Sequence, residues 1–287
     1  MATEQNCARH TRWRRLAAGL SWTRSSYTLL SAFLTTLLLI GYVWWPLAEE
    51  YLAMFDPSRP LWGQLDWLLI GNFLTMSTLI MGGANLKADA WTLVVGLIGG
   101  LVIESWGTQT ELWTYYTLER PPLWIIPAWP IASLSIDRLV RALDRLADVP
   151  APRLFRALYW ALFSGFYALM LSFVWPTLDK PLTVMALLLC LLLIASPTDH
   201  RLAVLTFAAG AGLGYFLERW GTTRLCWTYY TGQTPPLFAV VAHGMAAVAF
   251  WRAELLLRKT LHRILGRDAA RSGTDRSIPT GRLSPTD

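Results

Sequence analysis

A stretch of twenty residues occurs twice in this chain of 287 residues. The first copy, at positions 104–123, reads ESWGTQTELWTYYTLERPPL, and the second, at 218–237, reads ERWGTTRLCWTYYTGQTPPL. Twelve of the twenty positions are identical, and the copies begin 114 residues apart (218 − 104). An internal repeat constrains the fold of the whole chain, because both copies come from one structural unit. We therefore expect the chain to consist of two related halves.

The composition is typical of a membrane protein. Hydrophobic residues make up 54% of the chain and charged residues only 15%, whereas a soluble domain has about 25% charged residues. The 16 Trp residues point the same way, because Trp concentrates where membrane meets water. The net charge of +6 does not by itself indicate nucleic-acid binding, because most basic residues fall in the segments expected on the cytoplasmic side of the membrane. We expect no nucleic-acid partner.

Apolar segments long enough, or nearly so, to cross a bilayer fall into two groups of four. About 20 residues are needed to span the hydrocarbon. The segments are 27–45, 67–83, 91–103 and 122–137 in the first half, and 158–174, 182–195, 202–217 and 237–251 in the second. An even number of spans gives both halves the same orientation. We therefore predict an all-α polytopic membrane protein with about eight transmembrane helices, arranged as two parallel four-helix repeats.

The polar segments give the expected domain boundaries. Residues 27–145 form the first four-helix repeat, and residues 158–258 form the second. An Arg- and Pro-rich cytoplasmic connector at 146–157 separates them, with a basic N-terminus at 1–26 and a basic, disordered tail at 259–287. The basic start precedes an apolar run without a clear small-residue cleavage site, so we expect a retained signal anchor.

The basic residues predict the orientation in the membrane. If the N-terminus is cytoplasmic, 20 of the 25 Lys and Arg residues lie in cytoplasmic segments, as the positive-inside rule requires. The exceptions are Arg59, Arg120, Lys180, Arg219 and Arg224. We therefore expect a multi-pass protein of the bacterial inner (plasma) membrane, with both termini in the cytoplasm. Both copies of the repeated stretch would then lie at the outer face.

Glu104 and Glu218 are the candidate catalytic residues. Each follows a short apolar segment, so we expect its carboxyl at the edge of the hydrocarbon, where desolvation favours the neutral acid. A neutral carboxylic acid beside an apolar cavity can donate a proton to an alkene or an ether. The alternative is structural: each Glu bonds the backbone or hydroxyls of its own loop, or pairs with Arg219 or Arg120.

Aromatic residues recur at the same spacing in the two copies, and they are the candidate substrate-binding residues. A cationic intermediate is stabilised over aromatic faces. The alternative is an interfacial aromatic belt, and both interpretations stay open. The candidates are Trp106, Trp113, Tyr115 and Tyr116 in the first copy, Trp220, Trp227, Tyr229 and Tyr230 in the second, and His243 after it.

Two further features complete the candidate site. Gly107 and Gly221 follow a Trp in each copy, and we expect each to end a helix in the left-handed region. After Pro-Pro-Leu the copies diverge, so that Trp129 aligns with His243. A His within a span faces the bundle interior, where it could shuttle protons or bond a backbone carbonyl. The cysteines and histidines share no ligand spacing, so we expect no metal site and no cofactor.

The repeated stretch resembles a known family. The pattern Glu-x-x-Gly-Thr, Trp-x-Tyr-Tyr-Thr and Pro-Pro-Leu-Trp-x-x-Pro-x-Trp resembles that of the CruF-type carotenoid hydratase family, membrane proteins of carotenoid biosynthesis. It is similar, more loosely, to the lycopene-cyclase membrane domain. That domain has a Pro-x-Glu-Glu motif, whereas here Ala128 and Trp129 follow Pro127. The resemblance implies proton-initiated chemistry on an isoprenoid, with Glu104 or Glu218 as the acid.

Three classes of function remain open. The first is a protein of the inner membrane that binds or converts an apolar isoprenoid or lipid near the outer leaflet, as a lyase or isomerase in which a Glu protonates the substrate. The second is a non-catalytic membrane subunit that packs against partner helices or pigment. The third is a small-solute transporter, which ranks last because the spans contain few polar residues. The expected partners are a membrane lipid or isoprenoid, with a membrane-protein partner or a second copy of the chain left open.

Overall fold

The computed structural model describes residues 22–146 and 151–274, and most of these residues are helical. This confirms the predicted all-α class. The helices are α2 (Arg24–Val43), α3 (Trp45–Ala53), α4 (Trp67–Met81), α5 (Leu86–Gln109), α6 (Ala128–Leu146), α7 (Pro152–Val174), α8 (Pro181–Ile194), α9 (His200–Thr223) and α10 (Leu237–Thr274). The short elements are the 3-10 helices η1 (Leu61–Gly63) and η2 (Trp175–Thr177) and the strands β1 (Trp113–Tyr115) and β2 (Trp227–Tyr229).

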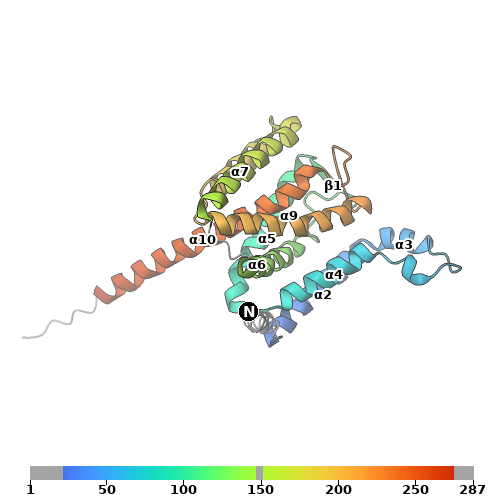
Figure 1. The fold of residues 1–287 in the computed structure, drawn as a ribbon, viewed down its shortest axis with the longest axis horizontal. Helices are drawn as coiled ribbons and strands as arrows, with labels where there is room; N and C mark the ends of the chain where they lie inside the picture. The colour runs from blue at the N-terminus through green and yellow to red at the C-terminus, as the bar shows by residue number, and fades with distance from the viewer. Residues whose placement is uncertain (1–21, 147–150, 275–287) are drawn as a thin grey trace, which may run out of the picture.

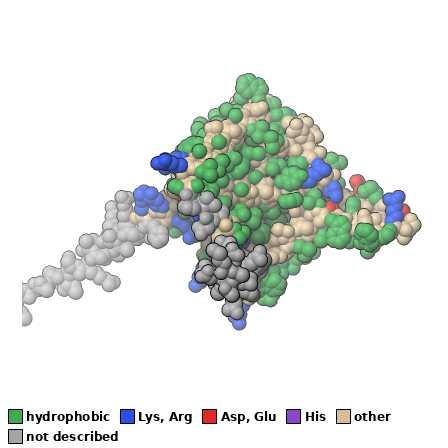
Figure 2. Space-filling model, in the orientation of Figure 1, with side chains coloured by type: hydrophobic (Ala, Val, Ile, Leu, Met, Phe, Trp, Pro, Cys, Tyr) green, Lys and Arg blue, Asp and Glu red, His purple; other side chains and the backbone are tan. Residues whose placement is uncertain are grey.

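The surface and the helix lengths indicate a membrane protein. Four stretches of the described residues are long and apolar enough to cross a bilayer: α2, α5, α7 continued through η2, and residues Leu237–Leu261 of α10. Helices α4 and α8 are apolar but shorter. Hydrophobic side chains spread across the visible face of the helical body (Figure 2). Exposed leucines such as Leu38, Leu188 and Leu192 fit a surface that lipid covers.

Helices α5, α6, α9 and α10 form the centre of the molecule (Figure 1). Each of the pairs α5–α6 and α9–α10 packs along its length, and the pairs contact one another through α6–α9 and α5–α10. Helix α7 packs on α9 and α10, whereas α2 packs mainly on α4. Figure 1 shows the C-terminal part of α10 extending away from this body.

Helices α5 and α9 present the two copies of the repeated stretch in the same way. Both contain 24 residues, and their first residues are 114 positions apart (200 − 86). Each begins at a side-chain N-cap, the residue type that best satisfies the free N–H groups of a first turn. Asn85 accepts from the N–H groups of Lys87 and Ala88, and Asp199 accepts from Leu202 N–H.

The expectation that Gly107 and Gly221 end their helices was wrong. Helix α5 continues beyond Gly107 to Gln109, and the left-handed residue is Glu111, with φ 65°. Leu112 N–H then bonds the Gly107 carbonyl at 2.9 Å, which is the closing bond of a Schellman motif. The same roles at the end of α9 belong to Gly221, Leu225 and Cys226. The glycines therefore have another purpose, described below.

Other boundaries differ from the sequence prediction in a simpler way. Helix α7 begins at Pro152, earlier than the predicted 158, because Pro fits the first turn of a helix well. Helix α3 lies mostly between the first two predicted spans, where no helix was predicted. Helix α10 continues to Thr274, into the tail predicted to be disordered. Residues 275–287 and most of the predicted N-terminal segment lie outside the described residues.

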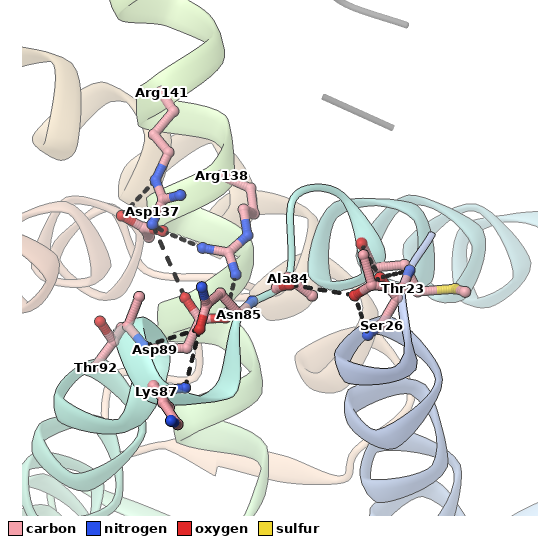
Figure 3. Close-up of polar contacts among 12 residues, drawn as sticks. Thr23, Ser26, Ala84, Asn85, Lys87, Asp89, Thr92, Asp137, Arg138 and Arg141 are labelled. Carbon is pink, nitrogen blue, oxygen red and sulfur yellow. Dashed lines mark hydrogen bonds and ion pairs between the residues drawn. The ribbon is translucent and has the colours of Figure 1, made fainter. Parts of the chain in front are cut away.

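A buried ionic cluster joins α5 to α6 at the end far from the repeated stretch (Figure 3). Arg138 bonds Asp89 and Asp137, each at 2.5 Å, and only 7% of Arg138 and 2% of Asp89 is exposed. Arg141 also contacts Asp137, at 2.6 Å. Two carboxylates thus neutralise one buried guanidinium, which is the condition for keeping such a charge inside a protein.

The Asp89→Ala variant tests this cluster. We expect the free energy of unfolding to fall by about 3 kcal/mol, the low end for a broken buried ion pair, because Asp137 still neutralises Arg138. Thermal melting in detergent measures the change. Asp56→Ala is the matched control, because its ion pair with Arg59 is exposed and such pairs contribute about 1 kcal/mol or less. Equal losses in both variants would show that the buried cluster has no special role.

Candidate functional site

The two copies of the repeated stretch meet directly as a two-stranded antiparallel sheet. Trp113 lies opposite Tyr229, Thr114 opposite Thr228, and Tyr115 opposite Trp227. The two Thr hydroxyls are 3.2 Å apart at the centre. Because each Trp faces a Tyr of the other copy, the arrangement looks the same from either strand. The sequence predicted that both copies lie together at one surface, but it did not predict that they would form a sheet.

Glu104 is buried in α5 and surrounded by ring donors. Only 3% of the residue is exposed. Its Oε2 accepts from Trp113 Nε1 at 3.0 Å, and its Oε1 accepts from the Tyr115 hydroxyl at 2.9 Å and from Trp129 Nε1 at 3.1 Å. An indole N–H can only donate, so this set of partners suits a carboxyl group that accepts with both oxygens.

Glu218 has the same environment with one partner changed. It is also 3% exposed, and it accepts from Trp227 Nε1 at 3.0 Å and from the Tyr229 hydroxyl at 2.8 Å. In place of a third hydrogen bond, His243 Nδ1 lies 3.7 Å from Glu218 Oε1. The same Nδ1 is 3.0 Å from the Ala239 carbonyl oxygen. Glu218 is therefore less completely bonded than Glu104.

Trp129 and His243, which the sequence aligns, lie against one another. Their rings are stacked, with centroids 5.9 Å apart and an interplanar angle of 14°. Because His243 Nδ1 faces a carbonyl oxygen, the neutral ring carries its proton on Nδ1 and leaves Nε2 as an acceptor. The backbone bond expected for this His is present. The Nδ1–H also lies 3.7 Å from Glu218 Oε1, close enough to donate a hydrogen bond to it after a small movement.

The ion-pair alternative for the two glutamates was wrong. Arg120 pairs with Glu111 at 2.6 Å, and Arg219 donates to the Thr234 carbonyl at 3.1 Å. Neither reaches a buried carboxyl. The hydrogen bond from Arg120 lowers the pKa of the exposed Glu111, so this pair is an ordinary surface contact.

The buried tyrosines remain proton donors over a wide pH range. Burial and the neighbouring Glu104 raise the pKa of Tyr115 well above its ordinary value, and burial and Glu218 do the same for Tyr229. A phenol with a raised pKa keeps its hydrogen and can donate it to the carboxyl. The aromatic residues of the sheet thus bond the carboxyls as well as providing apolar surface.

Glycines in α5 and α9 make room for the rings. A Cβ atom at Gly107 would lie 1.8 Å from the Trp113 ring, and one at Gly221 would lie 1.9 Å from the Trp227 ring. Gly100 gives the same clearance to Trp129, where a Cβ would be 2.2 Å from the ring. Gly214 clears His243 in the same way, at 2.4 Å. These close approaches explain why Gly stands inside two helices, where it is otherwise unfavourable.

The remaining candidates form the rim of the site. Trp106 donates to Thr183 of α8 at 3.3 Å, and Trp220 donates to Asp66, the N-cap of α4, at 2.9 Å. Each Trp thus contacts a helix from the other half of the chain. The hydroxyls of Tyr116 and Tyr230 instead bond the carbonyls of Val43 and Phe173, near the ends of α2 and α7.

A large, mainly apolar cavity of about 1490 Å³ lies against this cluster. Both carboxyl residues are on its wall, together with seven of the nine predicted binding residues: Trp106, Trp113, Tyr115, Trp220, Trp227, Tyr229 and His243. Tyr116 and Tyr230 are not on it. The cavity also extends along α2 and α4, where α2 stands away from the central helices.

Sequence reasoning missed two residues of the site. Trp129 was noted only as the partner of His243 in the alignment, and its bond to Glu104 needs the fold to be seen. Trp44 lies on the cavity wall, with its ring tilted by 36° against that of Trp220 and the centroids 5.1 Å apart. Its Nε1 is buried and has no hydrogen-bond partner in the described part of the chain. The Val-Trp-Trp-Pro sequence around Trp44 was visible, but nothing in it indicated an unbonded donor.

Comparisons of the chain with protein-family models, with curated proteins and with solved structures each find no match. The resemblance to carotenoid hydratases therefore stays a prediction. Within residues 22–146 and 151–274, no three or more His, Cys, Asp or Glu side chains lie together as a metal site would require.

Alanine at Gly107 or Gly221 tests the role of the glycines. We expect each variant to lower the free energy of unfolding by about 1–3 kcal/mol, because the added methyl group overpacks the Trp ring. Gly212→Ala is the control in the same helix as Gly221, since nothing lies within 4 Å of its Cβ position. That variant should be neutral or slightly stabilising, because Ala favours a helix over Gly. Thermal melting in detergent measures the stability of each variant. If Gly107→Ala is as stable as the wild type, Trp113 does not pack against Gly107 as described.

Proposed function

We propose that the chain is a polytopic membrane protein of two parallel four-helix repeats, with about eight spans in a bacterial inner membrane and both termini cytoplasmic. Three correspondences at a spacing of 114 residues support the repeats: the equal lengths of α5 and α9, the two Schellman ends, and the two carboxyl clusters. The hydrogen bonds between β1 and β2 support a common face for both copies. Parallel repeats require such a common face.

The protein binds an apolar ligand of the lipid or isoprenoid class in the cavity beside the two carboxyls. The observation that carries this proposal is a pair of buried carboxyl residues on the wall of a mainly apolar cavity of about 1490 Å³. Pockets for small molecules usually measure about 300–1,000 Å³, so the size favours a long ligand. The unbonded Trp44 N–H is available to a polar group of that ligand.

The two carboxyls have different roles, structural for Glu104 and chemical for Glu218. Glu104 accepts three hydrogen bonds from rings and holds α5, β1 and α6 together. Glu218 accepts two and faces His243. A general acid must hold a proton within reach of the ligand. Glu218 takes this role: the neutral acid gives its proton to the ligand and becomes a carboxylate, to which the nearby His243 Nδ1–H donates a hydrogen bond. This assignment favours an enzyme that acts by protonation.

The rival classes predict other results. A non-catalytic subunit would co-purify with a fixed partner protein in mild detergent, and the aromatic cluster would then lie at the contact. The aromatic residues of the sheet instead bond carboxyls inside the molecule. A transporter requires polar groups along its path, and the cavity wall is mainly apolar. Both observations favour an apolar ligand held in the cavity.

Ligand binding is tested by filling the cavity. Ala246 lies on the cavity wall, so Ala246→Trp should displace the ligand. We expect an apolar molecule in the solvent extract of purified wild-type protein, identified by mass spectrometry, and at least about tenfold less of it in the variant, as steric exclusion implies. Ala208→Trp is the matched control, because Ala208 of α9 is exposed and is not on the wall. Equal amounts in all three proteins would disprove the proposal.

The proton-transfer step is tested by two Gln variants. Glu218→Gln should reduce conversion by about 100- to 10,000-fold, the usual range for loss of a general acid. Glu104→Gln should retain conversion in proportion to the amount of folded protein. Chromatography of isoprenoids and lipids from cells that express each protein gives the readout. If both variants form as much product as the wild type, neither Glu is an acid. Losses that only follow the amount of folded protein in both variants would likewise show that neither carboxyl takes part in the chemistry.

A further inference from the structure

Two buried arginines occupy equivalent positions, 114 residues apart (252 − 138), in α6 and α10. Arg138 is 7% exposed and Arg252 is 5% exposed. In each case the Nε atom is buried without a partner in the described residues. A buried guanidinium destabilises a protein unless an opposite charge or a full set of hydrogen bonds compensates it. The two residues therefore face the same physical requirement.

Among the described residues, Arg138 meets this requirement and Arg252 does not. Its two carboxylates, Asp89 and Asp137, are each at 2.5 Å (Figure 3). The positions 114 residues after those aspartates hold Ala203 and Trp251. Both negative charges are thus missing around Arg252, and in the described part of the chain no carboxylate oxygen lies within 4.0 Å of its guanidinium.

The actual partners of Arg252 are two hydroxyls and a ring. Its terminal nitrogens donate to Thr198 Oγ1 at 3.3 Å and to Ser196 Oγ at 3.2 Å. Its Cζ lies 6.0 Å from the centre of the Trp251 ring. Charge-assisted hydrogen bonds to a carboxylate or phosphate are usually about 2.7–2.9 Å long. These contacts are longer than that, and none of them supplies a negative charge.

The guanidinium points toward an exposed link between α8 and α9. Ser196 and Thr198 are both exposed, so a ligand can reach them from solvent or from the headgroup region. Helix α9, 24 residues long, begins two positions after Thr198, at His200, and the start of a helix carries a partial positive charge that attracts anions. The carboxylate of Asp199 is engaged as the N-cap, with its oxygen 2.9 Å from Leu202 N–H.

We propose that Arg252, Ser196, Thr198 and the first turn of α9 form a binding site for a phosphate group, either of a lipid headgroup or of a free phosphate. Phosphate supplies the missing negative charge, and its oxygens match the fork of an arginine side chain. The hydroxyls turn to donate to the phosphate oxygens. Glu218 follows His200 by 18 residues (218 − 200), about 27 Å of helix. The phosphate site is therefore separate from the carboxyl cluster and does not depend on its function.

The full chain in a maltoside detergent, whose headgroup is uncharged, gives the test. Inorganic phosphate and phosphatidylglycerol are added separately at constant ionic strength, and the melting temperature is followed as a function of concentration. We expect at least one of them to raise the melting temperature of the wild type, because a ligand that binds the folded state stabilises it. A higher melting temperature with inorganic phosphate shows that a free phosphate is sufficient to occupy the site. A rise with phosphatidylglycerol alone identifies the lipid headgroup.

Matched variants make the result specific. Ala203→Asp places a carboxylate where Asp89 stands beside Arg138, so it should neutralise Arg252 from within and weaken phosphate binding at least about tenfold. Arg252→Gln should weaken binding to the same extent by removing the charge-assisted bonds. The double variant Ser196→Ala, Thr198→Ala changes only exposed hydroxyls and keeps the test decisive if a buried substitution prevents folding. Arg156→Gln removes an exposed charge and should respond like the wild type.

Two outcomes overturn the proposal. One is that neither inorganic phosphate nor phosphatidylglycerol raises the melting temperature of the wild type. The other is that the response is the same in the wild type and in the folded variants at positions 196, 198, 203 and 252. In either case the hydroxyls and the Trp251 ring alone compensate the buried charge.

Discussion

The hydrogen bonds between each buried glutamate and the rings of its own stretch determine the arrangement of the rest of the structure. A carboxyl inside an apolar helix bundle must be bonded, and Glu104 obtains its donors from Trp113 and Tyr115. These donors come from the strand that follows, so the chain has to turn back immediately after α5. The left-handed residue Glu111 makes that turn, and Gly107 leaves space for the returning Trp113. Pairing of β1 with β2 then joins the two halves.

Part of this arrangement was predictable. Periodicity and composition gave the all-α class and the approximate helices, and the repeat identified the buried carboxyls and most of the rings around them. The end of α5 was not predictable, because a Gly-Thr pair favours termination locally whereas packing of Trp113 requires Gly107 inside the helix. The sheet was also hidden, since strands of three residues show no periodic pattern. The absence of a carboxylate near Arg252 among the described residues was not predictable either, because the partners of a buried side chain come from other parts of the fold.

Residues related by the spacing of 114 positions have the same requirements, and the two halves of the chain satisfy them differently at two places. Beside the carboxyls, Trp129 bonds Glu104 whereas His243 stays 3.7 Å from Glu218. At the other end, Arg138 has two carboxylates whereas Arg252 has none within ion-pairing distance among the described residues. In both places the first half supplies a partner that the second half lacks among the described residues.

This asymmetry has a physical reason. The joined strands and the central helices α5, α6, α9 and α10 hold both halves in one body, so the more completely bonded cluster at each end is enough to fix the geometry of both. Loss of one hydrogen bond at Glu218 then costs about 1 kcal/mol, which a well-packed body tolerates. A missing counter-charge at Arg252 costs more, and a bound anion can offset it. We therefore expect chemistry and ligand binding where the second half lacks a partner that the first half has.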